Sequence, residues 1–203
     1  MVLEDPDRAL VRDLASDDST VRRRALGDLF DRHQTRVFNT AYRVLGSAVD
    51  AQDLTQEVFL QIADRIKGFR GDSSLTSWVY RMTVNLAIDA RRRRSRRPSV
   101  GWGASSDSDG DTREPSEARP GVTGAAVDPA EAALRVEREA KVRAALDELS
   151  PKLRAVVVLR YFENLSYEDL AEVLQTSIGT VKSRLNRAHS ALERVLGEAV
   201  PLA

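Results

Sequence analysis

The side chains best suited to chemistry lie between Ser166 and Leu196, where basic and short polar residues recur on one side of a helical pattern. The apolar residues there follow steps of three and four, which is typical of one buried helix face. The opposite face carries Thr180, Lys182, Ser183, Arg184, Asn186 and Arg187. Such a face suits the major groove of DNA, where Arg and Lys bind guanine edges and hydroxyls reach bases or phosphates.

A shorter helical pattern precedes this segment and predicts a helix-turn-helix. It begins at Ser166, with Asp169 three residues on, which is close to a capping box. Either Thr176 or Ser177 then caps the second helix. The alternative interpretation is an ordinary amphipathic helical hairpin whose basic face is only solvated.

A second group of residues, between Phe69 and Arg97, combines aromatic, amide and cationic side chains. A Gly/Ser loop precedes a helical pattern with Trp78 and Asn85, and six arginines occupy the seven positions from 91 to 97. Single-stranded nucleic acid is held by aromatic stacking beside a cationic track, and extruded bases need polar groups that read their edges. The alternative is that Trp78 and Tyr80 belong to the core and that the arginines form a solvated end.

A third group lies between Ala51 and Leu60, where Asp53, Gln56 and Glu57 share one helix face opposite Leu54. A polar and partly acidic face of this kind is suited to a basic or amide-rich partner helix. A solvated helix surface is the alternative.

Enzymatic interpretations find little support in the residue types. The chain has no cysteine and only two histidines, His33 and His189, which lie far apart in the sequence. It contains no glycine-rich phosphate loop, nucleophile elbow or motif of paired metal ligands. We therefore expect no catalytic residue, no metal and no cofactor.

The elements that must position these groups are helices throughout, so the expected fold class is all-α with two helical domains. No window alternates with period two for long enough to indicate a sheet. Residues 98–130 are rich in Pro, Gly, Ser and Asp and hold two basic against six acidic residues, so we interpret them as a flexible acidic linker. The predicted domains are 1–97 and 131–203. The absence of cysteines, of a secretory signal and of a run of about 20 apolar residues favours the cytoplasm.

Taken in order, the three groups resemble the sigma-70 family of bacterial RNA polymerase sigma factors, and more narrowly its extracytoplasmic-function (ECF) group. The resemblance rests on three motifs: DAQDLTQEVFL, SLTSWVYRMTVNLAIDARRR and LSYEDLAEVLQTSIGTVKSRLNRA. It covers about residues 8–97, as sigma domain two, and 131–197, as sigma domain four. It implies a transcription initiation factor that binds core RNA polymerase through the β′ coiled coil and the β subunit. It also implies promoter DNA and a cognate anti-sigma factor as partners.

The resemblance also implies roles for individual residues. The polymerase-binding positions are Asp53, Leu54, Gln56 and Glu57. The −10 DNA-binding positions are Phe69, Ser73, Ser74, Trp78, Arg81, Asn85, Arg91, Arg92 and Arg93. The −35 DNA-binding positions are Arg160, Tyr167, Glu168, Thr180, Lys182, Ser183, Arg184 and Arg187. A stand-alone helix-turn-helix regulator is the alternative from another class, and a helical nucleic-acid-modifying enzyme is a third.

Promoter geometry adds one expectation. A separation of roughly 17 base pairs between the −10 and −35 elements spans about 58 Å. A free linker of the length of residues 98–130 has an average end-to-end distance of roughly 32 Å. Its fully extended length is near 110 Å. The linker can therefore reach but cannot set the spacing, which a rigid third body such as polymerase must do.

Overall fold

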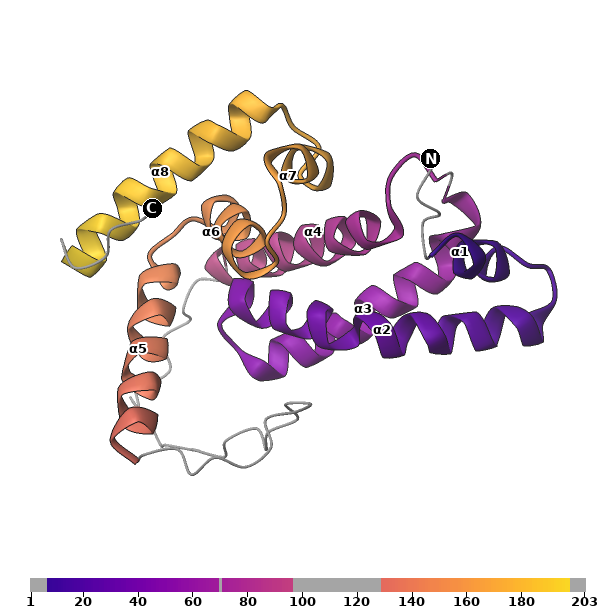
Figure 1. The fold of residues 1–203 in the computed structure, drawn as a ribbon, viewed down its shortest axis with the longest axis horizontal. Coiled ribbons are helices and arrows are strands. Elements are labelled where there is room, and N and C mark those ends of the chain that lie inside the picture. The colour runs from indigo at the N-terminus through magenta and orange to yellow at the C-terminus, as the bar shows by residue number, and fades with distance from the viewer. Residues whose placement is uncertain (1–6, 70, 97–128, 198–203) are drawn as a thin grey trace.

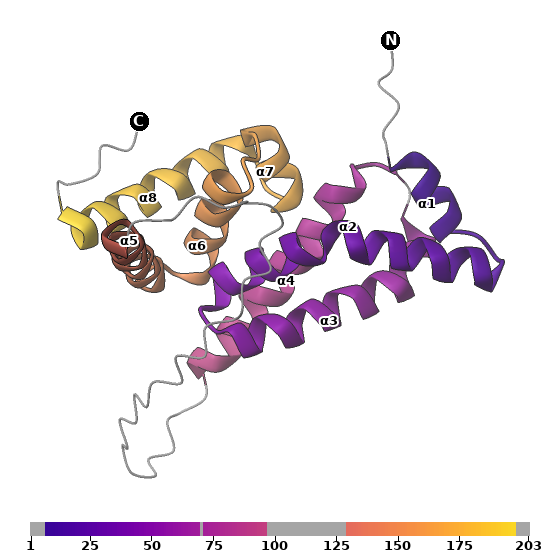
Figure 2. The same ribbon diagram turned by 60° about the horizontal axis from the view of Figure 1, so that its bottom comes forward.

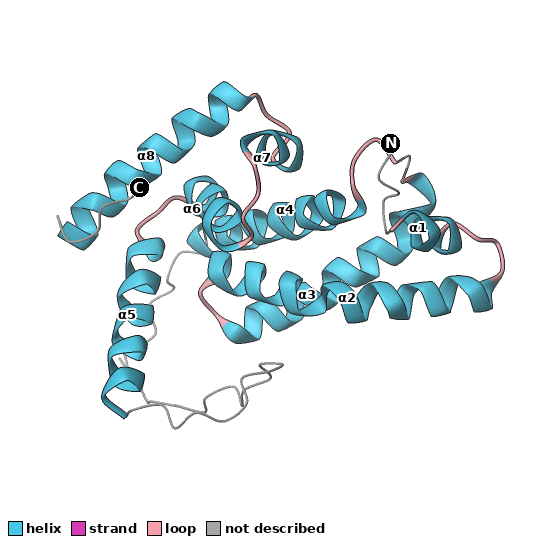
Figure 3. Ribbon diagram, in the orientation of Figure 1, coloured by secondary structure: helices cyan, strands magenta, loops and turns pink. Residues whose placement is uncertain are grey.

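The computed structural model describes residues 7–69, 71–96 and 129–197, and these residues form helices connected by short turns (Figures 1 and 3). The helices of the N-terminal half are α1 (Arg8–Leu14), α2 (Ser19–Leu45), α3 (Ala48–Arg65), η1 (Ile66–Gly68) and α4 (Leu75–Arg96). Those of the C-terminal half are α5 (Pro129–Asp147), α6 (Pro151–Val157), η2 (Val158–Phe162), α7 (Tyr167–Val173) and α8 (Ile178–Leu196). The described part contains no strand, and the predicted all-α class is confirmed.

The N-terminal half is a bundle in which α2, α3 and α4 surround one apolar core and α1 covers its end. The Asp18 carboxylate accepts hydrogen bonds from the backbone N–H groups of Thr20 and Val21 and so caps the start of α2. Gly46 ends α2 in the left-handed region, at φ 79°, and Ser47 caps α3 immediately afterwards. The chain therefore reverses within two residues, and α2 and α3 lie side by side (Figure 1).

The C-terminal half packs α6, α7 and α8 around a second core. Pro151 begins α6, and the helix continues into the short π-helix η2 before Asn164, at φ 55°, breaks it. The capping box of Ser166 and Asp169 is present, and Ser177 caps α8 through the backbone N–H of Thr180. These local signals agree with the sequence because each depends only on residues within one helix turn.

The two halves are not separate bodies. Tyr80, Val84 and Ile88 of α4 belong to the apolar core of the C-terminal half, and α4 lies directly against α6 and α7 (Figures 1 and 2). The sequence motifs carry no sign of this contact. Most of the predicted linker, including Trp102, lies outside the described residues, and so does Arg97. The last two residues of the predicted linker, Pro129 and Ala130, begin α5.

Candidate functional site

The predicted docking face of α3 is only partly a surface. Asp53, Gln56 and Glu57 are exposed, and Glu57 accepts a hydrogen bond from the Gln61 amide at 3.1 Å, within the same helix. Leu54, predicted with them, is 4% exposed and packs in the core of the bundle. Its place in the motif therefore reflects packing that holds the helix, and the exposed polar residues are the ones that can meet a partner.

Two apolar side chains extend this face and were missed by the sequence reasoning. Val49 is 70% exposed and Leu60 is 68% exposed. With Asp53 and Gln56 they follow the spacing i, i+4, i+7 and i+11, so they lie along one stripe of α3. The helical spacing alone could have placed them there, but an exposed leucine becomes visible only once the core has been filled by other residues.

A pocket of about 540 Å³ opens between the end of α3 and the middle of α4. Its lining is Asp64, Arg65, Gly68, Trp78, Arg81, Met82 and Asn85. Trp78 is half-buried and packs against Phe69, with ring centroids 5.3 Å apart, while Asn85 is exposed. An aromatic ring, an amide and a guanidinium thus border one opening, as a site for an extruded base requires.

The loop before α4 has a structural task as well. Ser74 Oγ accepts a hydrogen bond from the Ser77 backbone N–H at 3.0 Å and so caps the helix. Ser73 Oγ accepts from an Arg81 guanidinium nitrogen at 3.5 Å. The loop is therefore anchored to the helix whose side chains border the pocket. Tyr80 points the other way and is buried between the two halves, as the core interpretation expected.

The arginines at the end of α4 differ in their surroundings. Arg91 donates hydrogen bonds to the Val44 carbonyl at 3.0 Å and to Asp147, so it joins α2, α4 and α5. Arg92 approaches Asp89 at 4.0 Å, and Arg94 pairs with Asp50 at 3.1 Å. Arg93 is exposed. Of the three arginines predicted to bind −10 DNA, Arg92 is half-buried and Arg93 is exposed, whereas Arg91 is bonded within the fold.

The predicted −35 surface follows the N-terminal part of α8. Lys182, Ser183 and Arg187 are exposed, and Arg184 is half-buried. Ser183 Oγ donates to the Thr180 carbonyl at 3.0 Å, and Arg187 Nε donates to the Ser183 carbonyl at 3.3 Å. The Thr180 hydroxyl lies 3.0 Å from that of the capping residue Ser177. Intrahelical bonds of this kind hold the side chains along the helix.

Tyr167 gathers two cations beside this surface. The Arg160 guanidinium carbon lies 5.2 Å from the centre of the Tyr167 ring, and Lys182 Nζ lies 5.9 Å from it. Arg160 also donates to the Leu165 carbonyl at 2.8 Å, which fixes its direction. Glu168 is exposed on the next position of α7. The structure therefore brings predicted residues from η2, α7 and α8 into one cluster.

The two histidines lie in different halves of the protein, His33 in α2 and His189 in α8. His33 is 5% exposed in α2, and burial lowers the pKa of its imidazole. His189 Nε2 lies 2.7 Å from the Tyr161 hydroxyl, so it links α8 to η2. Among the described residues, no group of three or more His, Cys, Asp or Glu side chains could hold a metal ion. No helix in that part of the chain is long and apolar enough to span a membrane.

Comparison with known proteins places both halves in one family. The profile of Sigma-70 region 2 matches residues 29–97, and that of Sigma-70, region 4 matches residues 139–192. The RNA polymerase sigma-H factor of Pseudomonas aeruginosa is 35% identical over 198 residues, which cover 97% of this chain and 96% of that protein. The ECF RNA polymerase sigma factor SigW of Bacillus subtilis is 30% identical over 173 residues, covering 85% and 89%.

A solved structure of CnrH in complex with the cytosolic domain of CnrY has a similar fold, with a TM-score of 0.65 at 23% identity over 96% of this chain and 99% of that one. Membership in one family across nearly the whole length favours a sigma factor over a stand-alone regulator. Both family regions occur in order and its relatives match end to end, so the chain belongs to the sigma-70 family, in its ECF group, and is a sigma factor that acts with RNA polymerase in transcription initiation.

Proposed function

We propose that the chain binds core RNA polymerase through α3, captures −10 bases at the pocket beside Trp78, and reads the −35 element with α8. The observation that carries this proposal is the cluster of Arg160, Tyr167 and Lys182 at the start of α8. It adds oriented cations beside the predicted recognition face, where DNA phosphates would lie. Because polymerase and the chromosome are its partners, we place the protein in the bacterial cytoplasm.

For the −35 element, we assign base readout to Arg184 and Lys182. Arg187 and Arg160 would contact phosphates, and Ser183, Thr180, Tyr167 and Glu168 would contact bases or backbone nearby. The support is that Lys182, Ser183 and Arg187 are exposed, while Val181, Leu185 and Ala188 are buried. A helix anchored on one side and cationic on the other suits direct readout in the major groove.

For the −10 element, we assign base capture to the pocket bordered by Trp78, Arg81 and Asn85. Phe69 supports the Trp78 ring from behind, and Ser73 orients Arg81. Arg92 and Arg93 would follow the displaced strand. Stacking of a flipped base on an aromatic ring contributes about 1–3 kcal/mol.

For polymerase docking, we assign the exposed stripe of α3. Asp53, Gln56 and Glu57 offer carboxylate and amide groups to a basic helix, and Val49 and Leu60 offer apolar contacts at the two ends. The β′ coiled coil is the partner that the family resemblance implies for this stripe. The β subunit is the further polymerase partner that the resemblance implies. We also propose a cognate anti-sigma factor as a partner.

The test is reconstitution with sigma-free core polymerase. The wild-type chain should co-elute with the enzyme and give discrete run-off transcripts from a genomic promoter library. Glu57→Lys should abolish co-elution and keep the wild-type circular dichroism spectrum, and Leu60→Asp should weaken binding at least tenfold. Glu193→Lys, which reverses an exposed charge on α8, is the matched control and should bind as the wild type does. Normal polymerase affinity of the Glu57→Lys variant would remove the docking assignment.

A further inference from the structure

A cavity of about 460 Å³ lies between α2, α5 and η2, and none of the residues assigned above to polymerase or DNA lines it. Its volume is typical of a site for a small molecule. On the α5 side it is lined by Arg138, Val142 and Leu146, whose spacing of four residues puts them on one stripe of the helix. Leu146 is 4% exposed, Val142 is 42% exposed, and Arg138 is exposed as well. The stripe is therefore apolar at its inner end and cationic at its outer end.

Two aromatic rings line the cavity across from this stripe, and each carries a guanidinium group over its face. The Arg143 guanidinium carbon lies 5.3 Å from the centre of the Tyr42 ring, and that of Arg43 lies 4.5 Å from the centre of the Phe162 ring. The Tyr42 ring is itself stacked on Phe38, with centroids 6.2 Å apart. An arginine that a ring already holds in place loses less conformational freedom when it binds an anion. The two stacks therefore place cations in advance beside apolar walls.

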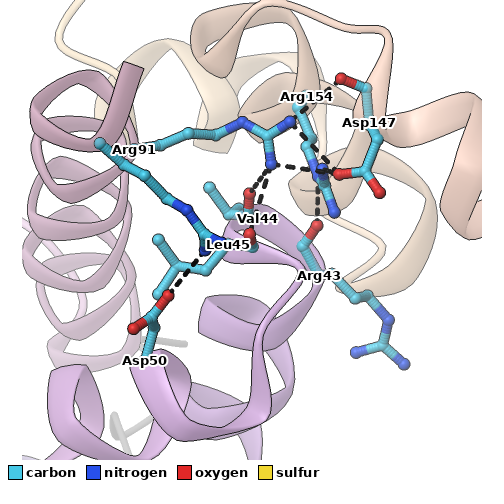
Figure 4. Close-up of polar contacts among 8 residues, drawn as sticks. Arg43, Val44, Leu45, Asp50, Arg91, Asp147 and Arg154 are labelled. Carbon is cyan, nitrogen blue, oxygen red and sulfur yellow. Dashed lines mark hydrogen bonds and ion pairs between the residues drawn. The ribbon is translucent and has the colours of Figure 1, made fainter. Parts of the chain in front are cut away.

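The most buried cation of the lining, Arg154, is bonded within the protein (Figure 4). It donates hydrogen bonds to the Asp147 carboxylate and to the backbone carbonyl of Arg43. The Arg43 side chain points away from this cluster in Figure 4. Burial lowers the pKa of Arg154, and the charges of Arg91 and Arg143 lower it further, whereas Asp147 opposes the change. Arg154 thus stabilises the wall of the cavity in a region of excess positive charge.

The cations at the opening outnumber the anions. Arg43, Arg138 and Arg143 share the lining with a single carboxylate, that of Glu139. The Arg43 guanidinium lies 3.9 Å from the Glu163 carboxylate, and neither Arg138 nor Arg143 forms an ion pair with another described residue. A guanidinium group presents a planar fork of donors that matches the oxygens of a phosphate. The opening is therefore suited to an anion that carries several phosphate oxygens.

We propose that this cavity binds a nucleotide. Its planar base lies against Val142 and Leu146, where the Asn39 amide in the lining offers a donor and an acceptor to the base edge. Its phosphates accept hydrogen bonds from Arg138 and Arg143 at the opening. Free phosphate would leave the apolar walls unused, and an uncharged ring compound would leave the arginines unused. The inference goes beyond the proposed function and does not depend on it, because the cavity shares no residue with the docking and DNA-binding surfaces.

Titration calorimetry of the purified full-length chain tests the ligand class. The probes are ATP, GTP, CTP and UTP, each compared with its nucleoside and with inorganic tripolyphosphate. We expect one-to-one binding of at least one nucleotide, with an affinity about tenfold or more above that of its nucleoside and of tripolyphosphate, since each of these fills only one part of the cavity. Tripolyphosphate that binds as tightly as the nucleotide would reduce the site to a plain anion patch and overturn the proposal. So would the absence of binding by all four nucleotides.

Two variants test the place of binding. Arg138→Glu reverses a charge at the opening, and Val142→Trp fills the apolar part; both positions are exposed, so the circular dichroism spectrum should stay that of the wild type. Each should weaken nucleotide binding by about tenfold or more. Lys141→Glu is the matched control, because it reverses an exposed charge on the same helix outside the cavity. Equal weakening by Lys141→Glu, or wild-type affinity in both test variants, would contradict the proposed site.

Hydrogen exchange of the bound chain provides an independent measurement. Residues 137–144 of α5 are all exposed, so little packing protects the amides of this stretch in the free protein. A nucleotide that joins α5 to α2 should slow their exchange and leave the exchange of α1, which does not line the cavity, unchanged. Unchanged exchange in α5 at saturating nucleotide would mean that the ligand binds elsewhere, and the proposal would fail. No polymerase or promoter is present in these experiments, so their failure leaves the proposed function unaffected.

Discussion

Some residues that lie in the predicted binding motifs contact other parts of the fold and not a partner. Leu54 lies inside the motif proposed for polymerase docking and yet fills the core. Arg91 heads an arginine cluster and yet donates hydrogen bonds to carbonyls at the end of α2. In both cases the side chain stabilises the helices that carry the predicted binding surface. Lys182 and Arg160, by contrast, share the ring of Tyr167, and this arrangement leaves them near the face of α8 proposed to meet DNA.

Replacement of Arg184 should change the specificity of the protein at one base pair. We expect Arg184→Ala to lose about 1–3 kcal/mol of discrimination at a single position of the −35 element, because a guanidinium that binds a guanine edge reads one base. The measurement is transcription from promoters substituted at each −35 position. Arg194→Ala, near the far end of α8, is the control and should leave the preferences unchanged. Equal weakening on all promoters would reassign Arg184 to phosphate binding.

His33 should make the stability depend on pH. Burial lowers its pKa in the folded chain below the value of 6.5 of the free side chain. The unfolded chain therefore takes up a proton first as the pH falls, so stability is complete above about pH 6.5 and declines below it. Urea unfolding at pH 7 and pH 5.5 should show a smaller loss for His33→Gln than for the wild type. His189→Gln is the matched control, and equal losses in all three proteins would contradict this prediction.

At the scale of the elements, the reversal between α2 and α3 determines where both halves meet. Gly46 ends α2 with a left-handed backbone, and a Cβ atom there would lie 3.3 Å from the Asp147 carboxylate and 3.5 Å from the Arg154 guanidinium. The same turn therefore needs glycine for its conformation and for its close approach to the C-terminal half. A local helix ending is thus also part of a long-range contact.

Two glycine replacements, one within α2 and one at its C-terminal end, should act in opposite directions. Gly46→Ala should lower the free energy of unfolding by about 1–2 kcal/mol, because an alanine is strained at positive φ. Gly27→Ala is the matched control, since nothing lies within 4 Å of its added Cβ atom. It should raise the stability by about 0.5–1 kcal/mol, because alanine loses less backbone entropy in a helix. Chemical denaturation measures the free energy of unfolding of both variants. An unchanged free energy of unfolding for Gly46→Ala would contradict the strain expected for an alanine at this position.

At the scale of the whole molecule, the two family regions share a core. Val84 lies within the segment that matches Sigma-70 region 2, but it packs with residues of the segment that matches region 4. The helix α8, which we propose reads the −35 element, is therefore supported through α6 and α7 by α4, which carries the proposed −10 pocket. The stability of one half should therefore depend on its contact with the other half.

Truncation of Val84 should loosen the C-terminal half. We expect Val84→Ala to destabilise α6, α7 and α8 by roughly 1–3 kcal/mol, since it leaves a cavity in their core. Hydrogen exchange of the amides in these helices should become faster by the corresponding factor. Val58→Ala, in the core of the N-terminal half, is the control and should act mainly on α2, α3 and α4. Unchanged exchange in α7 and α8 of the Val84→Ala protein would show that the halves are independent.

The helices, several of their caps and the family of this protein could be predicted from its sequence alone. The period of the apolar residues predicted the helices, and the caps at Ser166 and Ser177 and the break at Gly46 could be predicted because they depend on neighbours within one turn. The order and spacing of three motifs indicated the family. Their exposed polar residues, such as Gln56, Asn85 and Lys182, were predicted because polar side chains opposite an apolar stripe face away from the core.

Only the tertiary structure decided what covers each apolar stripe. Period indicates which side of a helix is buried, but it says nothing about the partner, so the burial of Val84 and Ile88 against the C-terminal half could not be predicted. The bond from Thr40 to Glu163 joins residues 123 positions apart, and Arg91 reaches Asp147 across 56 positions. Contacts over such sequence separations depend on the packing of whole helices. For this reason the packing of the two halves against each other could not be predicted from any local pattern.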